Sequence, residues 1–384
     1  MLNIQDLILS INNKKASGFL IKNSRNIFYI THYSGEGYIY VSTGREITLY
    51  VDGRYSQRAK IEVYKGKDKG KCKGFNINII GIKETYKDIA ADITEKFIDN
   101  NNNNDNGNKY KLAVLFESPY FTYEEFLSFK KAFKHLVKLI PSHNVLLKIR
   151  SLKDKNELYS IKRAVSIAED SFLNSLRMVL DSGLELSEQG IASEYKRGLL
   201  SNNSRESFET IVLSNENASM PHGVPSDKPI DKNGVLLCDF GAEWNWYKSD
   251  ETVTLHFGKP DKKFSDVYDV VYSAQQLAIS KIKPGVKFKD LDKIARDYIE
   301  KKGYGKYFTH SLGHGVGLDI HEYPYVYNKN ADTVKEGMVF TVEPGVYLEG
   351  EFGVRIEDMC YVERDGAQVI TNIKKKSFYI KDIL

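Results

Sequence analysis

The stretch S-L-G-H-G-V-G-L-D-I-H-E at residues 311–322 places two histidines in a glycine-rich, apolar setting and decides how the C-terminal half is interpreted. Four acidic residues accompany it, in the strings L-C-D-F-G-A (237–242), K-S-D-E-T (248–252), V-E-P-G (342–345) and V-R-I-E-D (354–358). An unpaired charge is costly in such apolar surroundings. We therefore expect these acids to be compensated by a bound partner.

The charge count of five side chains predicts a binuclear metal site. They are Asp239, Asp250, His314, Glu343 and Glu357. Hard divalent cations prefer carboxylate oxygens, and an imidazole widens the choice to Zn²⁺ and Fe²⁺. Four carboxylates would be neutralised by two divalent ions, whereas one ion would leave two buried negative charges. Paired metals activate a shared water near neutral pH, so the pattern predicts hydrolysis. A histidine on an apolar strand can also be a satisfied structural group.

The overall composition argues against several other classes of protein. With 384 residues and 41% hydrophobic content, the chain is long enough for two domains. Its 55 basic and 51 acidic residues nearly balance, so we expect no nucleic-acid or membrane binding. The densest basic stretch, Arg58 to Lys73, is interpreted as a solvated loop or strand edge rather than a polyanion-binding patch. Three scattered cysteines and the lack of a signal-peptide pattern predict a reducing, cytoplasmic setting.

The N-terminal part has the pattern of a mixed α/β domain. Residues 18–55 alternate short β-rich runs with turn signals. Helical stretches are expected near 84–99 and 122–138, with an apolar strand at 112–116 between them. The asparagine-rich run at 99–108 has no periodicity and is expected to be a surface loop.

From about residue 151 the pattern changes to a long amphipathic helix, since apolar residues recur at helical spacing from Leu158 to Phe172. We place the domain boundary so that the two domains span residues 1–148 and 149–384. Further helices are expected at 187–200, where Ser187 can act as N-cap, at 264–282, and at 288–302, which Gly303 would close. The β-rich runs are expected at 209–214, 234–256, 338–348 and 353–371. All four acids then lie on or at the ends of strands, which are rigid enough to hold carboxylates in place.

In order and spacing these strings resemble the pita-bread metallopeptidases of the aminopeptidase P, prolidase and methionine aminopeptidase group. Two N-terminal strings, N-I-F-Y-I-T-H-Y-S-G (26–35) and V-D-G-R-Y-S-Q-R-A (51–59), are similar to the leading domain of aminopeptidase P, prolidase and creatinase. The resemblance covers nearly the whole chain. It implies an α/β (α+β) protein with a creatinase-type N-terminal domain, a pita-bread catalytic domain and membership of the proline-specific branch.

The resemblance also implies a role for each ligand. Asp239 would bind one metal through both oxygens, Asp250 and Glu357 would bridge the pair, and His314 and Glu343 would complete the second metal site. Glu343 would in addition carry the proton from the water to the leaving nitrogen. Two divalent ions are implied, with Mn²⁺ as first choice and Co²⁺, Fe²⁺ or Zn²⁺ as alternatives.

Three further histidines match family positions near the substrate, and an arginine matches a position beside a metal ligand. His222 would contact the scissile region, His321 would stabilise the oxyanion, and His310 would line the pocket. Arg355 would orient Glu357 through a contact outside the metal site. The alternatives are that His222 is a turn residue and His310 a core histidine.

Two positions depart from the family pattern. Many relatives carry arginine where this chain has Val253, and some prolidases carry arginine where it has Tyr325. An arginine at the second position would hold the carboxylate of a dipeptide, so its replacement weakens the case for strict dipeptide specificity.

The expected function is that of a cytoplasmic, homodimeric, metal-dependent exopeptidase. Its substrate would be a peptide with proline in second position, from which it would remove the N-terminal residue. The alternative is an Xaa-Pro dipeptidase, or prolidase. Two more remote alternatives, a creatinase-like hydrolase and a non-catalytic binding module, would require lost metal ligands, and all five ligands are present.

Overall fold

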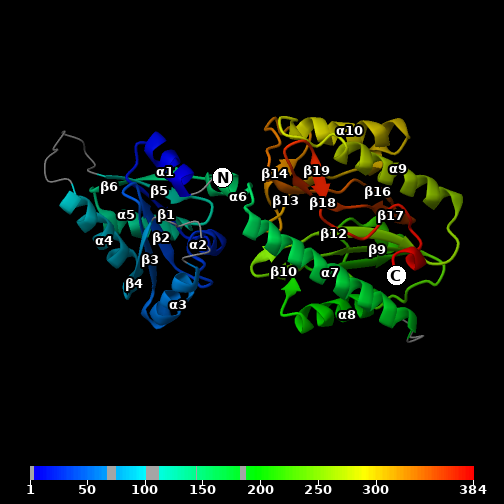
Figure 1. The fold of residues 1–384 in the computed structure, drawn as a ribbon, viewed down its shortest axis with the longest axis horizontal. Helices are drawn as coiled ribbons and strands as arrows, with labels where there is room; N and C mark the ends of the chain where they lie inside the picture. Colours follow the sequence, from blue (N-terminus) through cyan, green and yellow to red (C-terminus); the bar gives the residue numbers. More distant parts are fainter. Residues whose placement is uncertain (1–3, 67–74, 101–111, 144, 182–186) are drawn as a thin grey trace. The chain divides into compact units, whose positions relative to one another are not determined.

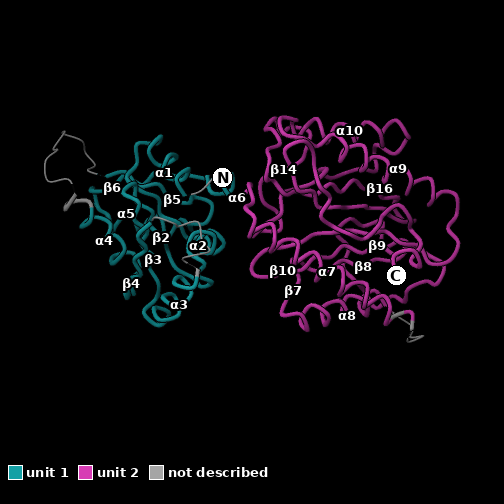
Figure 2. Tube along the Cα trace, in the orientation of Figure 1, with its two compact units in different colours: residues 1–150 teal, residues 151–384 magenta. Residues whose placement is uncertain are grey.

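The computed structural model describes residues 4–66, 75–100, 112–143, 145–181 and 187–384. Its contacts divide the chain into two compact units, residues 1–150 and 151–384 (Figure 2). Within the described ranges, no helix combines the length and the apolar character that crossing a membrane requires.

The first unit is built on a six-stranded mixed sheet with the strand order β4-β3-β2-β1-β5-β6 (Figure 1). The pairs β1–β2 and β2–β3 are antiparallel, whereas the pairs β3–β4, β1–β5 and β5–β6 are parallel. The strands are β1 (Gly18–Ile21), β2 (Tyr38–Ser42), β3 (Glu46–Asp52), β4 (Asn76–Ile82), β5 (Leu112–Glu117) and β6 (Val137–Ser142). The helices are α1 (Ile4–Asn13), α2 (Ser24–Thr31), α3 (Ser56–Gly66), α4 (Thr85–Asn100), α5 (Tyr123–Phe133) and α6 (Val145–Arg150), with a 3₁₀ turn η1 (Gly53–Tyr55).

The helix expected at 122–138 is shorter in the structure. A capping box formed by Thr122 and Glu125 starts α5, but the helix ends at Phe133, and Lys134 adopts a positive φ of 53°. Strand β6 then begins at Val137 and pairs with β5. The C-terminal end of the prediction was therefore wrong, because strand pairing overrode local helical preference.

Two helices replace segments that the sequence predicted to be strand or loop. Residues 24–31 form α2, started by the Asn23 side chain, which accepts hydrogen bonds from the Arg25 and Asn26 backbone N–H groups. The basic stretch from Arg58 onward forms α3 as far as Gly66, so the interpretation as a loop or strand edge was wrong there. Residues 67–73 of that stretch lie outside the described residues.

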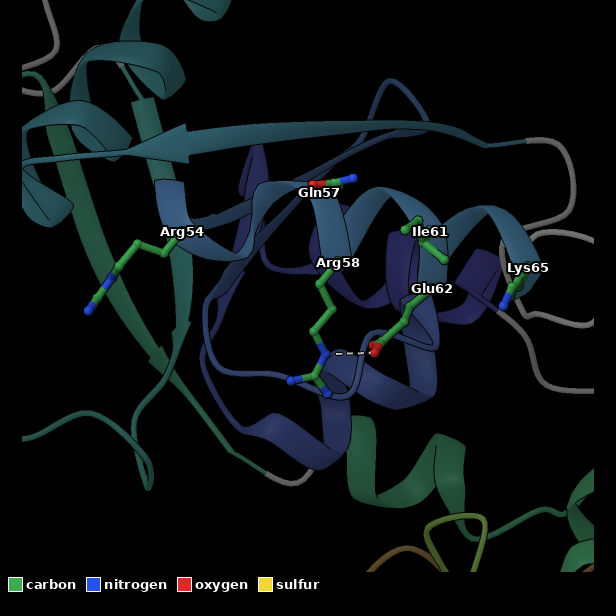
Figure 3. A pocket seen from close by; sticks show the side chains of 6 residues that line it. All are labelled: Arg54, Gln57, Arg58, Ile61, Glu62 and Lys65. Atoms are coloured by element: carbon green, nitrogen blue, oxygen red, sulfur yellow. Dashed lines mark hydrogen bonds and ion pairs between the residues drawn. The ribbon is translucent and has the colours of Figure 1, made fainter.

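Helix α3 presents several charged side chains on a shallow pocket of the first unit (Figure 3). Arg58 points toward Glu62 one turn further on, and the two form an ion pair of 2.7 Å between Nε and Oε1. Arg54 pairs with Asp52. The positive charge of these two arginines is thus partly balanced within the unit. Of the asparagine-rich run, residues 99 and 100 end α4, and the remainder lies outside the described residues.

The second unit contains four long helices and thirteen short strands among its described residues. The helices are α7 (Lys155–Asp181), α8 (Glu188–Ser201), α9 (Lys262–Ile279) and α10 (Phe288–Lys301), with 3₁₀ turns η2 (Asn215–Ser219), η3 (Gly305–Tyr307) and η4 (Ile380–Asp382). The strands are β7 (Arg205–Glu206), β8 (Ile211–Ser214), β9 (Val235–Phe240), β10 (Ala242–Trp244), β11 (Tyr247–Lys248), β12 (Glu251–His256), β13 (Gly313–Gly315), β14 (Glu322–Val326), β15 (Val339–Val342), β16 (Gly345–Leu348), β17 (Phe352–Arg355), β18 (Asp358–Val362) and β19 (Ala367–Val369).

These strands lie between two pairs of helices (Figure 1). Helices α7 and α8 pack on one face of the antiparallel sheet β12-β9-β8, in a core that includes Phe172, Phe240 and Val253. Helices α9 and α10 pack on the other side, in a larger core with the sheet β14-β13-β15-β18-β19 and the hairpin β16-β17. The strand ends between the two cores are therefore rigidly held from both sides.

The local sequence signals predicted the bounds of helices α8, α9 and α10 to within three residues. Ser187 caps α8 by accepting a hydrogen bond from the Gly190 N–H, as expected. Helix α10 ends at Lys301 and is followed by Gly303 at φ +88°, a conformation that favours glycine.

Candidate metal centre

The first two acids are brought together by an antiparallel pair with an inserted hairpin. Asp239 at the end of β9 lies opposite Thr252 of β12, and Phe240 lies opposite Glu251. The intervening residues form the small hairpin β10–β11, which turns at Asn245 and Trp246, both with positive φ. The eleven-residue spacing between Asp239 and Asp250 is thus the length that the chain needs to leave the sheet, form this hairpin and return to the sheet.

The other two acids, Glu343 and Glu357, lie at the ends of a second pair of antiparallel strands. Strands β15 and β18 pair with Val342 opposite Asp358, so Glu343 and Glu357 lie one residue beyond that pair on facing strands. His314 comes from β13, the neighbour of β15, and its backbone N–H donates to the Thr341 hydroxyl. Three strands of one sheet therefore deliver one histidine and two carboxylates to the same place.

All five side chains predicted from the sequence line a single cavity. His314 Nε2 lies 3.5 Å from Asp250 Oδ2 and 3.3 Å from Glu343 Oε1. Asp250, His314 and Glu357 each offer one ligand atom, and these atoms lie within 4.8 Å of one another. Asp239 lines the same cavity. This donor set of oxygens and one nitrogen suits a divalent cation.

The protein compensates only part of the charge of these carboxylates, through the ion pair between Arg355 and Asp239. Burial, together with the neighbouring acids, raises the pKa of Asp250 and Glu357 well above the usual values, and burial raises the pKa of Glu343 to about 8. The buried Oδ1 atom of Asp239 has no hydrogen-bond partner among the described residues. Divalent cations would satisfy that oxygen and stabilise the ionised carboxylates, so the residues present fit the group that the sequence predicted.

His314 is in the protonation state that a ligand requires. Burial, assisted by the nearby His321, lowers its pKa to about 3, so the imidazole is neutral near pH 7. Its Nδ1 lies 3.2 Å from the Gly315 carbonyl, which can accept a hydrogen bond from that nitrogen. Nε2, which faces Asp250 and Glu343, then keeps its lone pair for a cation.

Arg355 donates hydrogen bonds to several residues of the site. Its Nη2 donates to Asp239 Oδ2 at 2.7 Å, and its Nη1 donates to the Pro221 carbonyl at 3.2 Å. The contact with Glu357 that the sequence suggested is indirect: Arg355 Nε lies 3.1 Å from the Thr252 hydroxyl, which donates to Glu357 at 2.7 Å. The direct carboxylate partner of Arg355 is thus Asp239.

His310 lines the cavity, but both of its ring nitrogens are engaged. Nε2 lies 2.9 Å from the Tyr347 hydroxyl and Nδ1 lies 2.8 Å from the Ser311 carbonyl. The Tyr347 oxygen accepts from Arg355 Nη1, so its own proton is available to His310. Burial and the Arg355 charge lower the pKa of His310 to about 4, which keeps the ring neutral. His310 is therefore tied to the pocket wall.

His222 and His321 are exposed to the cavity, which has a volume of about 590 Å³. The His321 ring meets the His314 ring edge to face, with 4.2 Å between the centroids. Tyr325 also lines the cavity and is 43% exposed. Val253 lies elsewhere: it is 2% exposed and packs in the core beneath α7 and α8.

Three residues of the site were not recognised in the sequence. The hydroxyls of Thr252 and Thr341 donate to Glu357 and Glu343, and the Tyr347 hydroxyl joins Arg355 to His310. Strand periodicity could have identified Thr341, because a residue two positions from an acid at a strand end shares its face. The contact made by Tyr347 has no comparable local signal.

Comparisons with known proteins identify the family of each part of the chain. The model of Metallopeptidase family M24 matches residues 160–364, and that of the Creatinase/Prolidase N-terminal domain matches residues 4–152. The chain is 33% identical to an Xaa-Pro dipeptidase of Pyrococcus horikoshii over 380 residues, covering 97% of each protein.

Two solved structures are similar throughout. An Xaa-Pro dipeptidase from Bacillus anthracis has a TM-score of 0.86 at 30% identity and covers 98% of both chains. An X-Pro aminopeptidase from Thermotoga maritima has a TM-score of 0.82 at 29% identity and covers 95% of this chain and 98% of its own. The expected fold class, a creatinase-type α/β domain followed by a pita-bread domain, is confirmed. With its fold and its cluster of carboxylates and histidine, the chain belongs to metallopeptidase family M24.

Proposed function

We propose that this protein is a binuclear, metal-dependent Xaa-Pro aminopeptidase, which removes the N-terminal residue from peptides with proline in second position. The observation that carries the proposal is the convergence of four carboxylates and one neutral imidazole on one cavity, with the buried Asp239 Oδ1 unpartnered among the described residues. Proline's tertiary amide and fixed φ distinguish such a substrate from other peptides.

In this proposal Asp239, Asp250, His314, Glu343 and Glu357 hold two divalent ions. When bound, these ions would activate a water and polarise the scissile carbonyl. Asp250, His314 and Glu357 form one group of close ligand atoms, so these three residues would together hold one of the ions. Manganese is our first choice of metal, because carboxylate oxygens dominate the donor set.

Glu343 is proposed as the proton carrier. Its Oε1 lies 3.3 Å from His314 Nε2 and accepts a hydrogen bond from the Thr341 hydroxyl, so this carboxylate lies inside the site, where it could take a proton from the water and pass it to the leaving nitrogen. His321 and His222 are proposed to bind the reacting part of the peptide, since both are exposed in the cavity. His321 would donate to the oxyanion that forms at the scissile carbonyl.

The charges of the cavity favour an aminopeptidase over a dipeptidase. Among the lining residues that the structure describes, Arg355 is the single lysine or arginine, and its guanidinium is already bound to Asp239, Tyr347 and Pro221. A dipeptide with proline at its end carries a free carboxylate, which would meet no available guanidinium or ammonium in this lining. Tyr325, at the position where some prolidases carry an arginine, lines the cavity but offers no positive charge.

The second candidate is an Xaa-Pro dipeptidase. It is favoured by the names of the relatives, since those from P. horikoshii and B. anthracis are both called Xaa-Pro dipeptidases. The two candidates differ in whether the substrate ends at proline.

A comparison of three peptides tests these proposals. Ala-Pro-Ala, Ala-Pro and Ala-Ala-Ala would be incubated with enzyme reconstituted separately with Mn²⁺, Co²⁺ and Zn²⁺, and free alanine measured. Cleavage of Ala-Pro-Ala well above the others is the expected result. Faster cleavage of Ala-Pro would establish the dipeptidase instead. Equal cleavage of Ala-Ala-Ala would refute proline specificity, and a folded protein that binds none of the metals would favour a creatinase-like hydrolase or a binding module.

Three further properties belong to this proposal. We propose a homodimer, which light scattering on the purified protein would test. We propose a reducing, cytoplasmic setting, supported by Cys238 and Cys360, which are both buried and unpaired. We also propose that residues 1–148 and 149–384 are separate domains, which separate expression and unfolding of each part would test.

A further inference from the structure

A buried lysine lies directly behind the candidate metal centre. Lys375 is 6% exposed, and its Nζ lies 2.5 Å from Glu251 Oε1 and 2.7 Å from Asp358 Oδ1. Glu251 follows Asp250 in the chain, and Asp358 follows Glu357. The ammonium group of Lys375 thus binds both Glu251 and Asp358, which are the chain neighbours of the metal-centre carboxylates Asp250 and Glu357.

The pairing of β12 shows on which side of the sheet this ammonium lies. Thr252 is opposite Asp239, so both face the metal centre, whereas Val253 is opposite Cys238 in the core beneath α7 and α8. Because side chains alternate along a strand, Glu251 shares the face of Val253. Lys375 therefore contacts Glu251 from the side opposite to the one on which Asp250 faces the cavity.

A glutamine of α9 belongs to the same network and extends it to the residue that precedes Glu343. Gln275 is fully buried, and its Nε2 donates to Asp358 Oδ2 at 2.9 Å and approaches the carbonyls of Val342 and Ile356 at 3.3 and 3.4 Å. Val342 precedes Glu343 and Ile356 precedes Glu357 in the chain. The network thus touches the chain neighbours of Asp250, Glu343 and Glu357.

Stability alone is a poor explanation for such a network. Desolvating an ammonium and two carboxylates is costly, and well-packed apolar side chains in place of a buried ion pair are often as stable or more so. What apolar packing cannot provide is a directional tie between two particular backbones. Here that tie joins the β9–β12 hairpin to β18, which supply different carboxylates to the same centre.

We propose that Lys375 is a positioning residue of the metal centre, which holds Asp250 and Glu357 at a fixed separation by binding Glu251 and Asp358. The proposal rests on the proposed function, because it assumes that these carboxylates bind metal. It predicts that the loss of Lys375 weakens metal binding although the residue contacts neither the ions nor the substrate.

Whether the substitution of Lys375 weakens or strengthens metal binding distinguishes a positioning role from a purely electrostatic one. Replacing Lys375 by methionine removes a positive charge near the site, which by itself would strengthen the binding of a cation. Loss of position would instead weaken it. Weaker binding in Lys375→Met can therefore not be attributed to the removed charge.

The test uses the full-length protein, freed of metal, and two matched controls. Lys374→Met and Lys376→Met make the same change at the exposed neighbours of Lys375. Calorimetric titration with Co²⁺ measures the dissociation constants, and the visible spectrum of the cobalt protein reports the ligand geometry. Circular dichroism first establishes that each variant is folded at the titration temperature.

We expect Lys375→Met to bind Co²⁺ about 10- to 100-fold more weakly, as for other residues that orient ligands, and to change the cobalt spectrum. Both controls should retain the wild-type affinity and spectrum. A folded Lys375→Met with unchanged affinity and spectrum would overturn the proposal, even if its melting temperature fell.

Two further outcomes are decisive as well. If Lys375→Met does not fold, Glu251→Gln replaces it, because this variant keeps the side-chain shape and weakens one half of the tie; weaker Co²⁺ binding would support the proposal, and wild-type binding would overturn it. A wild-type protein that binds no metal would overturn the proposed function together with this inference. Normal wild-type binding with an unaltered Lys375→Met would overturn the inference alone.

Discussion

The metal-free protein should lose stability as the pH rises through neutrality. Burial raises the pKa of Glu343 from 4.5 to about 8, so the folded protein keeps a proton that the unfolded chain has already released. The unfolding free energy then falls with pH, and between pH 7 and 8.5 the contribution of Glu343 amounts to roughly 1.3 kcal/mol. Asp250 and Glu357, whose pKa values are also raised, change stability in the same direction.

The pH window is chosen to avoid the histidines. Burial lowers the pKa of four histidines, His256, His310, His314 and His321, so these groups reduce stability mainly below about pH 7, where the unfolded chain takes up protons on its histidines. Each contributes less than about 0.2 kcal/mol above pH 7, so between pH 7 and 8.5 the carboxyl groups dominate the change.

Urea unfolding of the chelator-treated protein measures the effect. Both tryptophans, Trp244 and Trp246, lie in the second unit, so their fluorescence follows the unit that carries the site. Glu343→Gln serves as the control, because an amide does not titrate and should flatten the slope. Saturating Mn²⁺ should also flatten it, because metal binding keeps the carboxylates ionised. A metal-free wild-type protein whose stability stays constant or increases from pH 7 to 8.5 would refute the reasoning.

Three other predictions concern single substitutions. Val253→Arg should lower the unfolding free energy by about 3 kcal/mol or more in urea titrations, because it would bury an unpaired charge in the core; an unchanged midpoint would show that the position tolerates the arginine of its relatives. Thr252→Val should weaken metal binding about tenfold in calorimetry, since Glu357 loses a hydrogen bond, and wild-type affinity would contradict this. His321→Ala should lower kcat/KM more than His310→Ala, which should mainly lower the melting temperature; the reverse order would assign the substrate contact to His310.

Elements with strong local signals could be predicted from the sequence. Ser187 before an apolar periodic segment marked the start of α8, and Gly303 marked the end of α10. Helix α2 could not be recognised in this way. Its residues 26–31 are all buried and rich in β-branched and aromatic types, which have low helical propensity. Its helical form depends on the Asn23 cap and on burial in the first unit.

The sequence by itself determined the family, the five candidate ligands and the charge that demands divalent cations. Such properties follow from residue types and short spacings, like the hairpin return that separates Asp239 from Asp250. Only the tertiary structure decided the partners behind them. Arg355 reaches Asp239 across 116 residues, and Lys375 reaches Glu251 across 124. No local pattern encodes contacts between such distant segments, because they form only when sheets and helices pack around a common core.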